Sequence, residues 1–474
     1  MTVDEQKWSF RHNEDGKTTQ ITMPGQAGES LVEFDETGAV SAWSASAGDK
    51  QIAFERYSYD QYGNLSGLKK DGQTASYSYD AMDQLVEEKT LDGQTINYTY
   101  DKRGNRTHIN NQVVAEFDNS NRMTKFKGQA ITYDADGNRI NDGRLKYLWD
   151  GLGKLTAIEE VNGTKKWQFV YDEQGRRIQK TGPSGTIRFH YDGDSNRLMA
   201  ETDTAGKAIR EYVYNADHIL VGLKTNGTWY NYQRNYRGDI VAITDTLGNV
   251  AAKYTYDTWG KPLTSNITDS KLTGQPIRYA SYYYDEDLAL YYLMARYYNS
   301  EQAVFLSIDP LLDSNESIEM ANGYSYVMNN PLTRIDPDGL MWRPDGYGYG
   351  YYSYGSGIRY YTSVRKITVP AKKSVPLSNL QYLIRSKSLG RGSTGRQVPR
   401  TYKEEVAMRN VLYNPNSGRI LNMTKGMTDP RWRQQDGWRK MAKNVDGVEI
   451  HYLKNIKTGK FDDFKFDDKR GKKK

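Results

Sequence analysis

The chain has 474 residues, with 65 Lys and Arg against 59 Asp and Glu, 39 Tyr, 43 Gly and no Cys. The absence of Cys excludes disulfide scaffolds, cysteine nucleophiles and thiolate-bound metal sites. No apolar run approaches the ~20 residues that cross a bilayer as a helix.

The net charge of +6 conceals two very different parts. Residues 341–474 carry 29 Lys and Arg against 11 Asp and Glu, a net charge of +18, whereas residues 1–340 carry a net charge of −12. An ordinary solvated basic surface is the plainer interpretation. The size of the step instead predicts an acidic scaffold followed by a basic module, for which nucleic acid is the first partner to consider.

A short motif, Tyr-x-Tyr-Asp-x-x-Gly-Asn, recurs through the first 270 residues at steps of about 20 residues. The alternating Tyr-x-Tyr stretch is typical of a strand with its rings on one face, and Asp-x-x-Gly-Asn is typical of a turn. Such a hairpin cannot bury its own apolar face, so neighbouring units must pair into a long sheet. We therefore expect structural roles, rather than ligand binding, for the repeated Asp and Tyr residues. The copies are centred on Asp60, Asp101, Asp134, Asp172, Asp192 and Asp257, with weaker ones on Asp35, Asp80, Asp118, Asp150 and Asn215.

This motif resembles the YD repeat of the Rhs family of bacterial polymorphic toxins, which includes the wall-associated protein A group. The resemblance implies a mainly β fold, in which the hairpins of residues 1–274 spiral into a cocoon-like shell. In that family the shell is closed by an Rhs-associated core, here residues 275–340. The core is followed by a Gly/Tyr-rich linker over 341–378 and a small, basic α+β toxin domain over 379–474.

The match to the Rhs-associated core is carried by Leu-Tyr-Tyr-Leu-Met-Ala-Arg-Tyr-Tyr-Asn at 290–299, by Ser-Ile-Asp-Pro at 307–310 and by Asp-Pro-Asp-Gly-Leu at 336–340. Several family members cut themselves after that Leu with two Asp residues. The resemblance therefore assigns Asp309 and Asp336 as an aspartyl-protease-like pair, Arg296 as its anchor, and Leu340 as the residue before the cut bond. Two carboxylates that share one proton can activate a water. The alternative is that both Asp-Pro pairs only begin turns.

In the basic tail, a helix is predicted over 401–413, with Thr401 as N-cap and Glu404 three residues later. Strands are predicted over 419–423, 448–453 and 461–466. His451 is the one His after residue 340, and its strand puts it on the same face as Glu449, as the next strand does for Asp463 and Lys465. A lone His is usually structural, but the basic surroundings and the nearby carboxylate favour catalysis.

The tail also resembles the C-terminal toxin domains of the wall-associated protein A group and of contact-dependent inhibition toxins, some of which are transfer-RNA nucleases. That resemblance implies a ribonuclease, and cleavage without a metal needs a base for the 2′-hydroxyl, cations for the phosphorane and an acid for the leaving oxygen. The candidate catalytic residues are His451, Lys425, Asp429, Arg431, Glu449 and Asp463, and the candidate RNA-binding residues are Trp432, Arg433, Tyr452 and Lys465. No cofactor is expected. A Mg²⁺ site of Asp462, Asp463 or Glu449 is disfavoured, because adjacent strand residues point to opposite faces.

The sequence therefore predicts the C-terminal part of a secreted toxin of the cell wall or cell surface that acts in contact-dependent growth inhibition. Its tail would cleave tRNA in the cytoplasm of a neighbouring bacterium, and an acidic immunity protein would neutralise it in the producer. The alternatives are a DNase toxin, or a non-enzymatic surface protein that binds carbohydrate or wall polymers. Because the first residues lack the features of a signal peptide, we expect a fragment of a longer protein or an orphan toxin cassette.

Overall fold

The computed structural model describes residues 1–310, 322–340, 342–344, 411, 418–421, 431–445, 448–458 and 461–466. It divides into two compact units, Met1–Tyr351 and Tyr352–Lys474. The described residues are mainly β, as predicted, and none of their helices has the length and hydropathy to cross a membrane.

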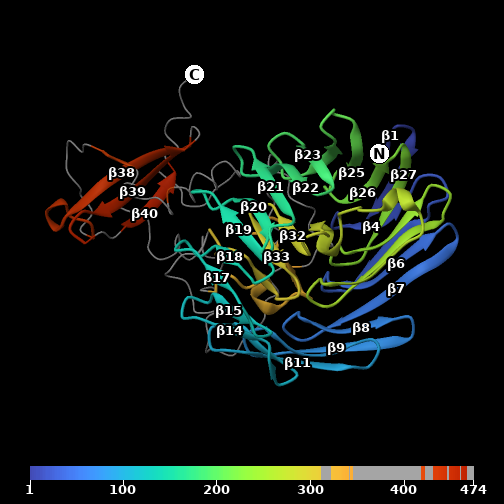
Figure 1. Ribbon diagram of the computed structural model, residues 1–474, viewed down its shortest axis with the longest axis horizontal. Coiled ribbons are helices and arrows are strands. Elements are labelled where there is room, and N and C mark those ends of the chain that lie inside the picture. The colour runs from blue at the N-terminus through green and yellow to red at the C-terminus, as the bar shows by residue number, and fades with distance from the viewer. Residues whose placement is uncertain are drawn as a thin grey trace. The chain divides into compact units, whose positions relative to one another are not determined.

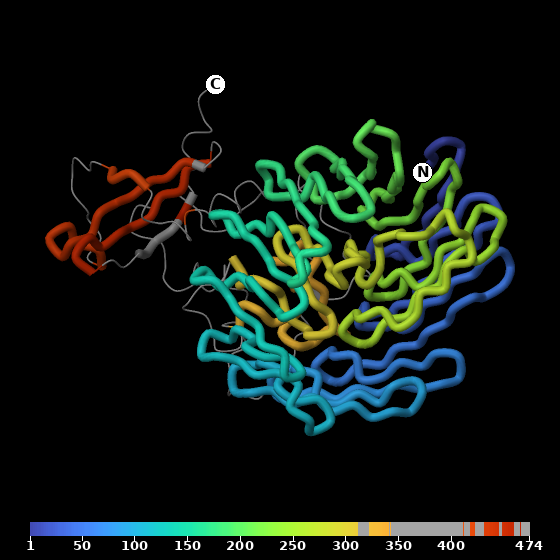
Figure 2. Tube along the Cα trace, in the orientation of Figure 1, coloured from blue at the N-terminus to red at the C-terminus, as the bar shows by residue number. Residues whose placement is uncertain are grey.

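The first unit is built from antiparallel strands that pair in chain order, so that each strand lies beside the one before it (Figures 1 and 2). Two large sheets hold most of these strands. The 11-stranded sheet contains β3 (Ser9–His12), β4 (Thr18–Thr22), β5 (Glu29–Phe34), β6 (Val40–Ala47), β7 (Lys50–Tyr59), β8 (Leu65–Lys70), β9 (Gln73–Tyr79), β10 (Leu85–Lys89), β11 (Thr95–Tyr100), β12 (Arg106–Ile109) and β13 (Gln112–Val113). The 14-stranded sheet contains β17 (Thr132–Tyr133), β18 (Arg139–Asn141), β19 (Leu145–Trp149), β20 (Leu155–Glu160), β21 (Lys166–Tyr171), β22 (Arg177–Gly182), β23 (Gly185–Tyr191), β24 (Leu198–Thr202), β25 (Ala208–Tyr214), β26 (Leu220–Thr225), β27 (Thr228–Arg234), β28 (Ile240–Asp245), β29 (Val250–Tyr256) and β30 (Pro262–Ile267).

Smaller elements complete this unit. A short hairpin and a three-stranded sheet flank the large sheets, three 3-10 helices follow them, and the last strands form a four-stranded and a two-stranded sheet. They are β1 (Thr2–Val3) with β2 (Gln6–Lys7); β14 (Ala115–Phe117), β15 (Met123–Phe126) and β16 (Gln129–Ala130); η1 (Ser270–Leu272), η2 (Tyr279–Ser281) and η3 (Val327–Asn329); β31 (Tyr283–Asp285), β32 (Leu290–Leu293), β33 (Arg296–Asn299) and β34 (Val304–Phe305); and β35 (Arg334–Ile335) with β36 (Arg343–Pro344).

The repeated Asp closes most turns with its own carboxylate; the turn at Asp192 is one residue longer, and there the carboxylate pairs with the Arg197 side chain. In the turn after β11, Asp101 Oδ1 accepts the backbone N–H of Arg103 at 2.8 Å and of Asn105 at 3.0 Å, and Asp101 Oδ2 accepts the Asn105 amide at 2.9 Å. Gly104 takes the left-handed conformation that the turn requires, with φ of 74°. The predicted repeat is therefore confirmed in atomic detail. In many other turns, too, the side-chain oxygen accepts the backbone N–H of the residue four positions later. These turns begin at Asp35, Asp60, Asp80, Asp118, Asp134, Asp150, Asp172, Asp203, Asn215, Asn235, Asp245 and Asp257.

In seven motifs the Tyr directly before the Asp or Asn binds the unit before it. The Tyr100 hydroxyl donates to the carbonyl oxygen of Leu85 at 2.6 Å, and Leu85 is the first residue after the preceding turn. This tyrosine clamp fixes the distance between successive turns, because it joins the end of one strand to the exit of the neighbouring turn. The same contact joins Tyr59 to Val40, Tyr79 to Leu65, Tyr171 to Leu155, Tyr191 to Arg177, Tyr214 to Leu198 and Tyr256 to Ile240.

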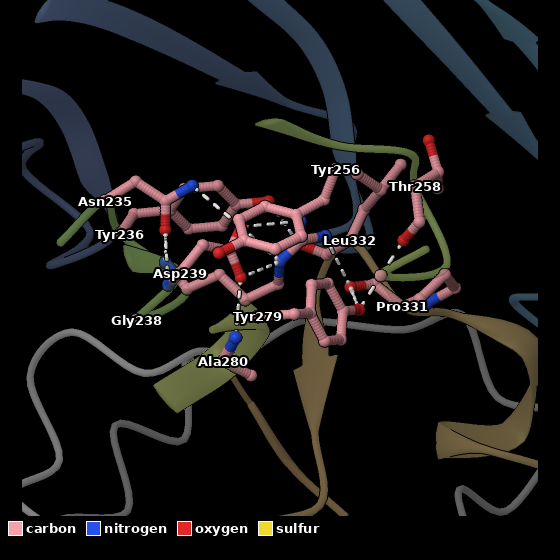
Figure 3. Close-up of polar contacts among 12 residues, drawn as sticks. Asn235, Tyr236, Gly238, Asp239, Tyr256, Thr258, Tyr279, Ala280, Pro331 and Leu332 are labelled. Atoms are coloured by element: carbon pink, nitrogen blue, oxygen red, sulfur yellow. Dashed lines mark hydrogen bonds and ion pairs between the residues drawn. The ribbon is translucent and has the colours of Figure 1, made fainter. Parts of the chain in front are cut away.

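The segment after β30 packs against the repeat strands rather than extending them. Tyr292 and Tyr297, from β32 and β33, share one hydrophobic cluster with Trp167 and Phe169 of β21. Figure 3 shows a polar part of this contact, where the turn after β27 meets the core segment. There the Tyr236 hydroxyl donates to Leu332 O at 2.6 Å and the Asp239 carboxylate accepts the Ala280 N–H at 2.8 Å.

Arginines extend this anchoring at three turns. Most repeats carry an apolar residue directly after the turn, but Arg106, Arg139 and Arg177 occupy that position and are buried. Each reaches the core segment: Arg177 forms an ion pair with Asp285 at 2.6 Å, Arg139 donates to Gln302 at 2.7 Å, and Arg106 donates to Glu301 O at 3.1 Å. Burial raises the pKa of the Asp285 carboxyl, but Arg177 and Lys180 outweigh it and hold that pKa below its ordinary value.

The described part of the second unit is a four-stranded antiparallel sheet. It comprises β37 (Arg419–Ile420), β38 (Trp438–Val445), β39 (Val448–Asn455) and β40 (Phe461–Phe466), with η5 (Gln434–Asp436) before β38. The predicted strands over 448–453 and 461–466 are confirmed, the described part of the strand predicted over 419–423 is Arg419–Ile420, and β38 was not predicted. The predicted helix over 401–413 lies outside the described residues except for Val411.

We expect Asp101→Ala to lower the free energy of unfolding by about 1–3 kcal/mol, because two backbone N–H groups lose their acceptor. Urea unfolding followed by circular dichroism measures the change. Asp136→Ala is the matched control: Asp136 lies exposed in a neighbouring turn and, among the described residues, its carboxylate accepts no hydrogen bond. Equal effects of the two substitutions would contradict a structural role for the repeated Asp.

Candidate functional site

The structure brings Arg296, Asp309 and Asp336 together, although 40 positions separate the first from the last. Arg296 Nη2 lies 2.8 Å from Asp309 Oδ2 and 3.3 Å from Asp336 Oδ2, so one guanidinium nitrogen bridges both carboxylates. The guanidinium also lies 3.6 Å from the centre of the Phe305 ring. These are the residues that the resemblance assigned to a self-cleaving pair, and we call this group the aspartate site.

Backbone contacts hold the aspartate site in place. Arg296 Nε donates to Gly339 O, and Arg296 Nη1 donates to Gly323 O at 3.0 Å. Gly339 has a φ of 72°, and a Cβ there would stand 2.5 Å from the carbonyl oxygen of Leu293, so the close approach requires glycine. The Asp-Pro-Asp-Gly-Leu segment is thereby fixed against the turn between β32 and β33.

The peptide around Leu340 lies against one of the two carboxylates. The Leu340 N–H donates to Asp336 Oδ1 at 3.1 Å and to Asp338 Oδ1 at 3.3 Å. The bond predicted to be cut is on the carbonyl side of Leu340, the same residue whose N–H contacts the Asp336 carboxylate. Met341, on the other side of that bond, lies outside the described residues.

The two carboxylates lie in different environments. Burial raises the pKa of Asp336, Arg296 lowers it and the charges of Asp338 and Asp309 raise it, and together they place that pKa at about 7. Asp309 is the more exposed of the pair and lies closer to Arg296. Near neutral pH, Asp336 can therefore carry a proton, while Asp309 makes the shorter contact with the guanidinium. This is the division of labour that general acid–base chemistry requires.

Asp336 is positioned through its backbone by a tyrosine that the sequence did not single out. The Asp336 N–H donates to the Tyr282 hydroxyl at 2.8 Å, and that hydroxyl lies 3.0 Å from the hydroxyl of Tyr326. Both tyrosines are buried. The three consecutive tyrosines at 282–284 are typical of a strand, but nothing in the sequence indicates which residue the hydroxyl of Tyr282 would meet.

In the second unit, one row of side chains crosses all four strands. Arg419 in β37 is paired with Ala442 in β38, Ala442 with His451 in β39, and His451 with Lys465 in β40. Directly paired residues of antiparallel strands project from the same face. His451 and Lys465, both predicted site residues, are therefore neighbours, with Arg419 in the same row.

Glu449 joins this row through a shared carboxylate oxygen. Glu449 Oε1 lies 3.2 Å from His451 Nε2 and 3.1 Å from Arg419 Nη2. The Glu449 side chain is 5% exposed, and those of His451 and Arg419 are 15% and 58% exposed. The prediction that Glu449 and His451 share a face is confirmed, and we call Arg419, Glu449, His451 and Lys465 the histidine site.

Arg419 was missed by sequence reasoning. The predicted strand at 419–423 contains it, but a single strand does not reveal its neighbour in the sheet. Only the pairing of β37 with β38 brings Arg419 to Glu449.

Four other predicted tail residues, Arg431, Trp432, Arg433 and Tyr452, lie outside this row of paired residues. Arg431 and Arg433 are exposed on the segment before β38, and the Arg431 guanidinium stacks 4.2 Å from the Trp432 ring. Trp432 and Tyr452 are buried, so neither ring offers an open face to a nucleotide base in this arrangement. Tyr452 also lies on the face opposite His451, because it is the next residue of the strand.

Three further predicted catalytic residues, or their side chains, fall outside the described part of the tail. Lys425 and Asp429 lie outside the described residues, as does the side chain of Asp463. The register of β40 shifts between its pairings with His451 and Leu453, which places a bulge near Asp463. Within the described residues, no group of three or more His, Asp or Glu side chains comes together as metal ligands.

Comparisons with known proteins agree with the fold of the first unit. A family model described as the teneurin YD-shell matches residues 9–332. The chain is 38% identical over 351 residues to a tRNA3(Ser)-specific nuclease WapA of Bacillus spizizenii, covering 72% of this chain but 15% of that protein. It is 26% identical over 307 residues to a probable deoxyribonuclease RhsB of Dickeya dadantii, covering 60% of this chain and 20% of that protein. A crystal structure of TcdB2–TccC3 shares the fold, with a TM-score of 0.59 and 20% identity over 72% of this chain and 20% of that chain.

We expect Tyr282→Phe to reduce the free energy of unfolding by about 1–3 kcal/mol, because the buried Asp336 N–H loses its acceptor. Tyr284→Phe is the control, since the hydroxyl of Tyr284 makes no hydrogen bond to any described residue. Thermal and urea unfolding of both variants test the expectation. It would be wrong if Tyr282→Phe were as stable as Tyr284→Phe.

Proposed function

Because the chain belongs to the teneurin YD-shell family, we propose that it is the C-terminal part of an Rhs-type polymorphic toxin whose basic tail is a ribonuclease that cuts tRNA. The contact of His451 with Glu449, within a segment of net charge +18, carries the proposal. The relative named as a tRNA3(Ser)-specific nuclease supports it. The chain spans 15% of that relative's length, so activity, substrate and partners of the whole protein are part of the proposal.

The proposed reaction is attack of a ribose 2′-oxygen on the adjacent phosphorus. His451 takes the proton of the 2′-hydroxyl, the bond from phosphorus to the 5′-oxygen breaks, and a general acid protonates that leaving oxygen. The products are a 2′,3′-cyclic phosphate and a free 5′-hydroxyl. Lys465, beside His451, stabilises the charge of the phosphorane, and Glu449 orients the imidazole. This route needs no metal ion.

The remaining predicted residues complete the proposal around this centre. Asp429 and Asp463 are candidates for the general acid. Lys425, Arg431 and Arg433 would hold the RNA backbone through charge-assisted hydrogen bonds. Trp432 and Tyr452 would contact a base only if their present packing changed, so they are the weakest members of the predicted set.

The proposed biological setting follows from the same family. The protein would be secreted to the cell wall or surface of its producer, and the tail would act in the cytoplasm of a neighbouring cell. The producer would need a cognate immunity protein, and the basic charge of the tail favours an acidic partner.

A deoxyribonuclease is the second candidate, because one relative is named a probable deoxyribonuclease. DNA has no 2′-hydroxyl, so the attack described above cannot occur on it. The choice of substrate therefore tests the chemistry as well as the biology.

The aspartate site supports a second proposed reaction, self-cleavage after Leu340. Asp309 takes a proton from a water that attacks the Leu340 carbonyl carbon, and Asp336 supplies the proton that the departing Met341 nitrogen needs. Arg296 keeps the two carboxylates together. The contact from the Leu340 N–H to Asp336 Oδ1 carries this proposal.

We expect the purified chain to cleave tRNA, and His451→Ala to slow cleavage about 10²–10⁴-fold, the usual contribution of a general base or acid. Denaturing gels of labelled tRNA and a duplex DNA of equal length measure both activities. His190→Ala is the control, because His190 is an exposed histidine of β23. Cleavage of the DNA alone would favour the second candidate, and full activity of His451→Ala would refute the assigned role.

Self-cleavage should release a fragment that begins at Met341, and Asp336→Asn should abolish it. Its rate should fall as the pH rises above about 7, because the raised pKa of Asp336 means that the proton donor is lost there. Intact mass and N-terminal sequencing of the products over pH 5–9 provide the measurement. A fragment starting at Met341 from the Asp336→Asn chain would rule out this mechanism.

A further inference from the structure

We infer that Arg419 is a catalytic residue of the tail, whose guanidinium binds the phosphate that is cut; the inference rests on the proposed ribonuclease. Arg419 is a member of the histidine site that no sequence pattern indicated. Its role follows from its register in the sheet, its one restrained contact and its exposed donors.

The register sets the distance between Arg419 and His451. One strand, β38, lies between β37 and β39, and Ala442 is the residue of β38 that is paired with both. Neighbouring strands are about 4.8 Å apart, so the two backbones are separated by roughly 10 Å. Ala442 carries only a methyl group, so the long side chains on either side can reach toward the same phosphate.

Glu449 restrains the two reactive groups relative to one another. Its single oxygen Oε1 is within 3.2 Å of a nitrogen of each, and its side chain is 5% exposed. A buried carboxylate of this kind is stable only when it is paired, so both contacts are favoured. The guanidinium and the imidazole are therefore held on one face before any substrate arrives.

Arg419 keeps most of its hydrogen-bonding capacity for a ligand. A guanidinium has five N–H donors, and among the described residues Arg419 contacts only Glu449, through Nη2. The side chain is 58% exposed. A guanidinium with remaining donors, anchored by a carboxylate at one nitrogen, is suited to bidentate binding of phosphate.

The row also places a positive charge on each side of the imidazole. Lys465 lies beside His451 on β40 and Arg419 lies on the other side of it, so the imidazole is flanked by positive charge within one row. The phosphorane formed during attack carries more negative charge on its equatorial oxygens than the ground state does. Donors that are fixed in advance on two sides stabilise it without reorganisation.

The test measures kcat and KM for tRNA with the full chain and its Arg419→Ala and Arg419→Lys variants. We expect Arg419→Ala to lower kcat/KM about 100-fold, mainly through kcat, and Arg419→Lys to recover only part of the loss, because lysine keeps the charge without the fork. Inorganic phosphate should inhibit the parent chain competitively and Arg419→Ala more weakly. The acidic limb of the pH profile should move to higher pH in Arg419→Ala, since a positive charge near the imidazole is gone.

Arg439→Ala is the matched control. It removes the same charge from β38, but the Arg439 guanidinium donates to the carbonyl oxygens of Gln434 and Trp438, and Arg439 is paired with Lys454 on the other face. Should Arg419→Ala unfold, Arg419→Gln retains a donor for Glu449 and serves the same comparison.

The outcomes separate this inference from the proposed function. Loss of activity in His451→Ala with kcat/KM of Arg419→Ala within threefold of the parent would overturn the role of Arg419 and leave the ribonuclease standing. If Arg419 served only to neutralise the charge of Glu449, lysine would replace it fully. Full activity of Arg419→Lys would therefore also overturn the proposed phosphate-binding role of Arg419. A parent chain that cleaves no RNA would refute both.

Discussion

The fold depends on a carboxylate that closes a turn and a tyrosine hydroxyl that binds the exit of the turn before it. The first contact fixes the conformation of one repeat, and the second fixes its distance from the next. In the turn after β11, these are the contacts of Asp101 with Asn105 and of Tyr100 with Leu85. Because both are local in sequence, a sheet of many strands can keep one register without long-range signals.

The positions that follow the turns connect this regular sheet to the irregular core. At most turns this position is apolar, and at three turns that contact the core segment it is Arg106, Arg139 or Arg177. A buried arginine must find an acceptor, and the core segment supplies Asp285, Gln302 and a backbone carbonyl. The arginines therefore add polar contacts to the apolar ones that hold the core segment against the sheet. The same segment carries Arg296 and the two carboxylates of the aspartate site.

Local contacts were predictable from the sequence and pairings between distant segments were not. The turns were recognised where an aromatic residue directly precedes the Asp or Asn, and those at Asp203, Asn235 and Asp245 were missed because Thr or Arg stands there. Arg296, Asp309 and Asp336 came from a family resemblance, since their spacing alone carries no geometry. Alternation along β39 related Glu449 to His451, but no periodicity could assign Arg419 to the same row. Trp432 and Tyr452 were predicted to stack on bases because the sequence does not reveal which aromatic rings are buried in the folded domain.

The long-range contacts of the core segment have a consequence for biosynthesis. Asn330 binds Asn64 across 266 positions, and Leu65 binds Thr333 across 268. Neighbouring repeats can pair as they leave the ribosome, since loop closure between them is short. These long-range contacts, however, can form only after residue 333 has emerged. They therefore form at the end of shell synthesis. A chain interrupted earlier would have neither these contacts nor the basic tail.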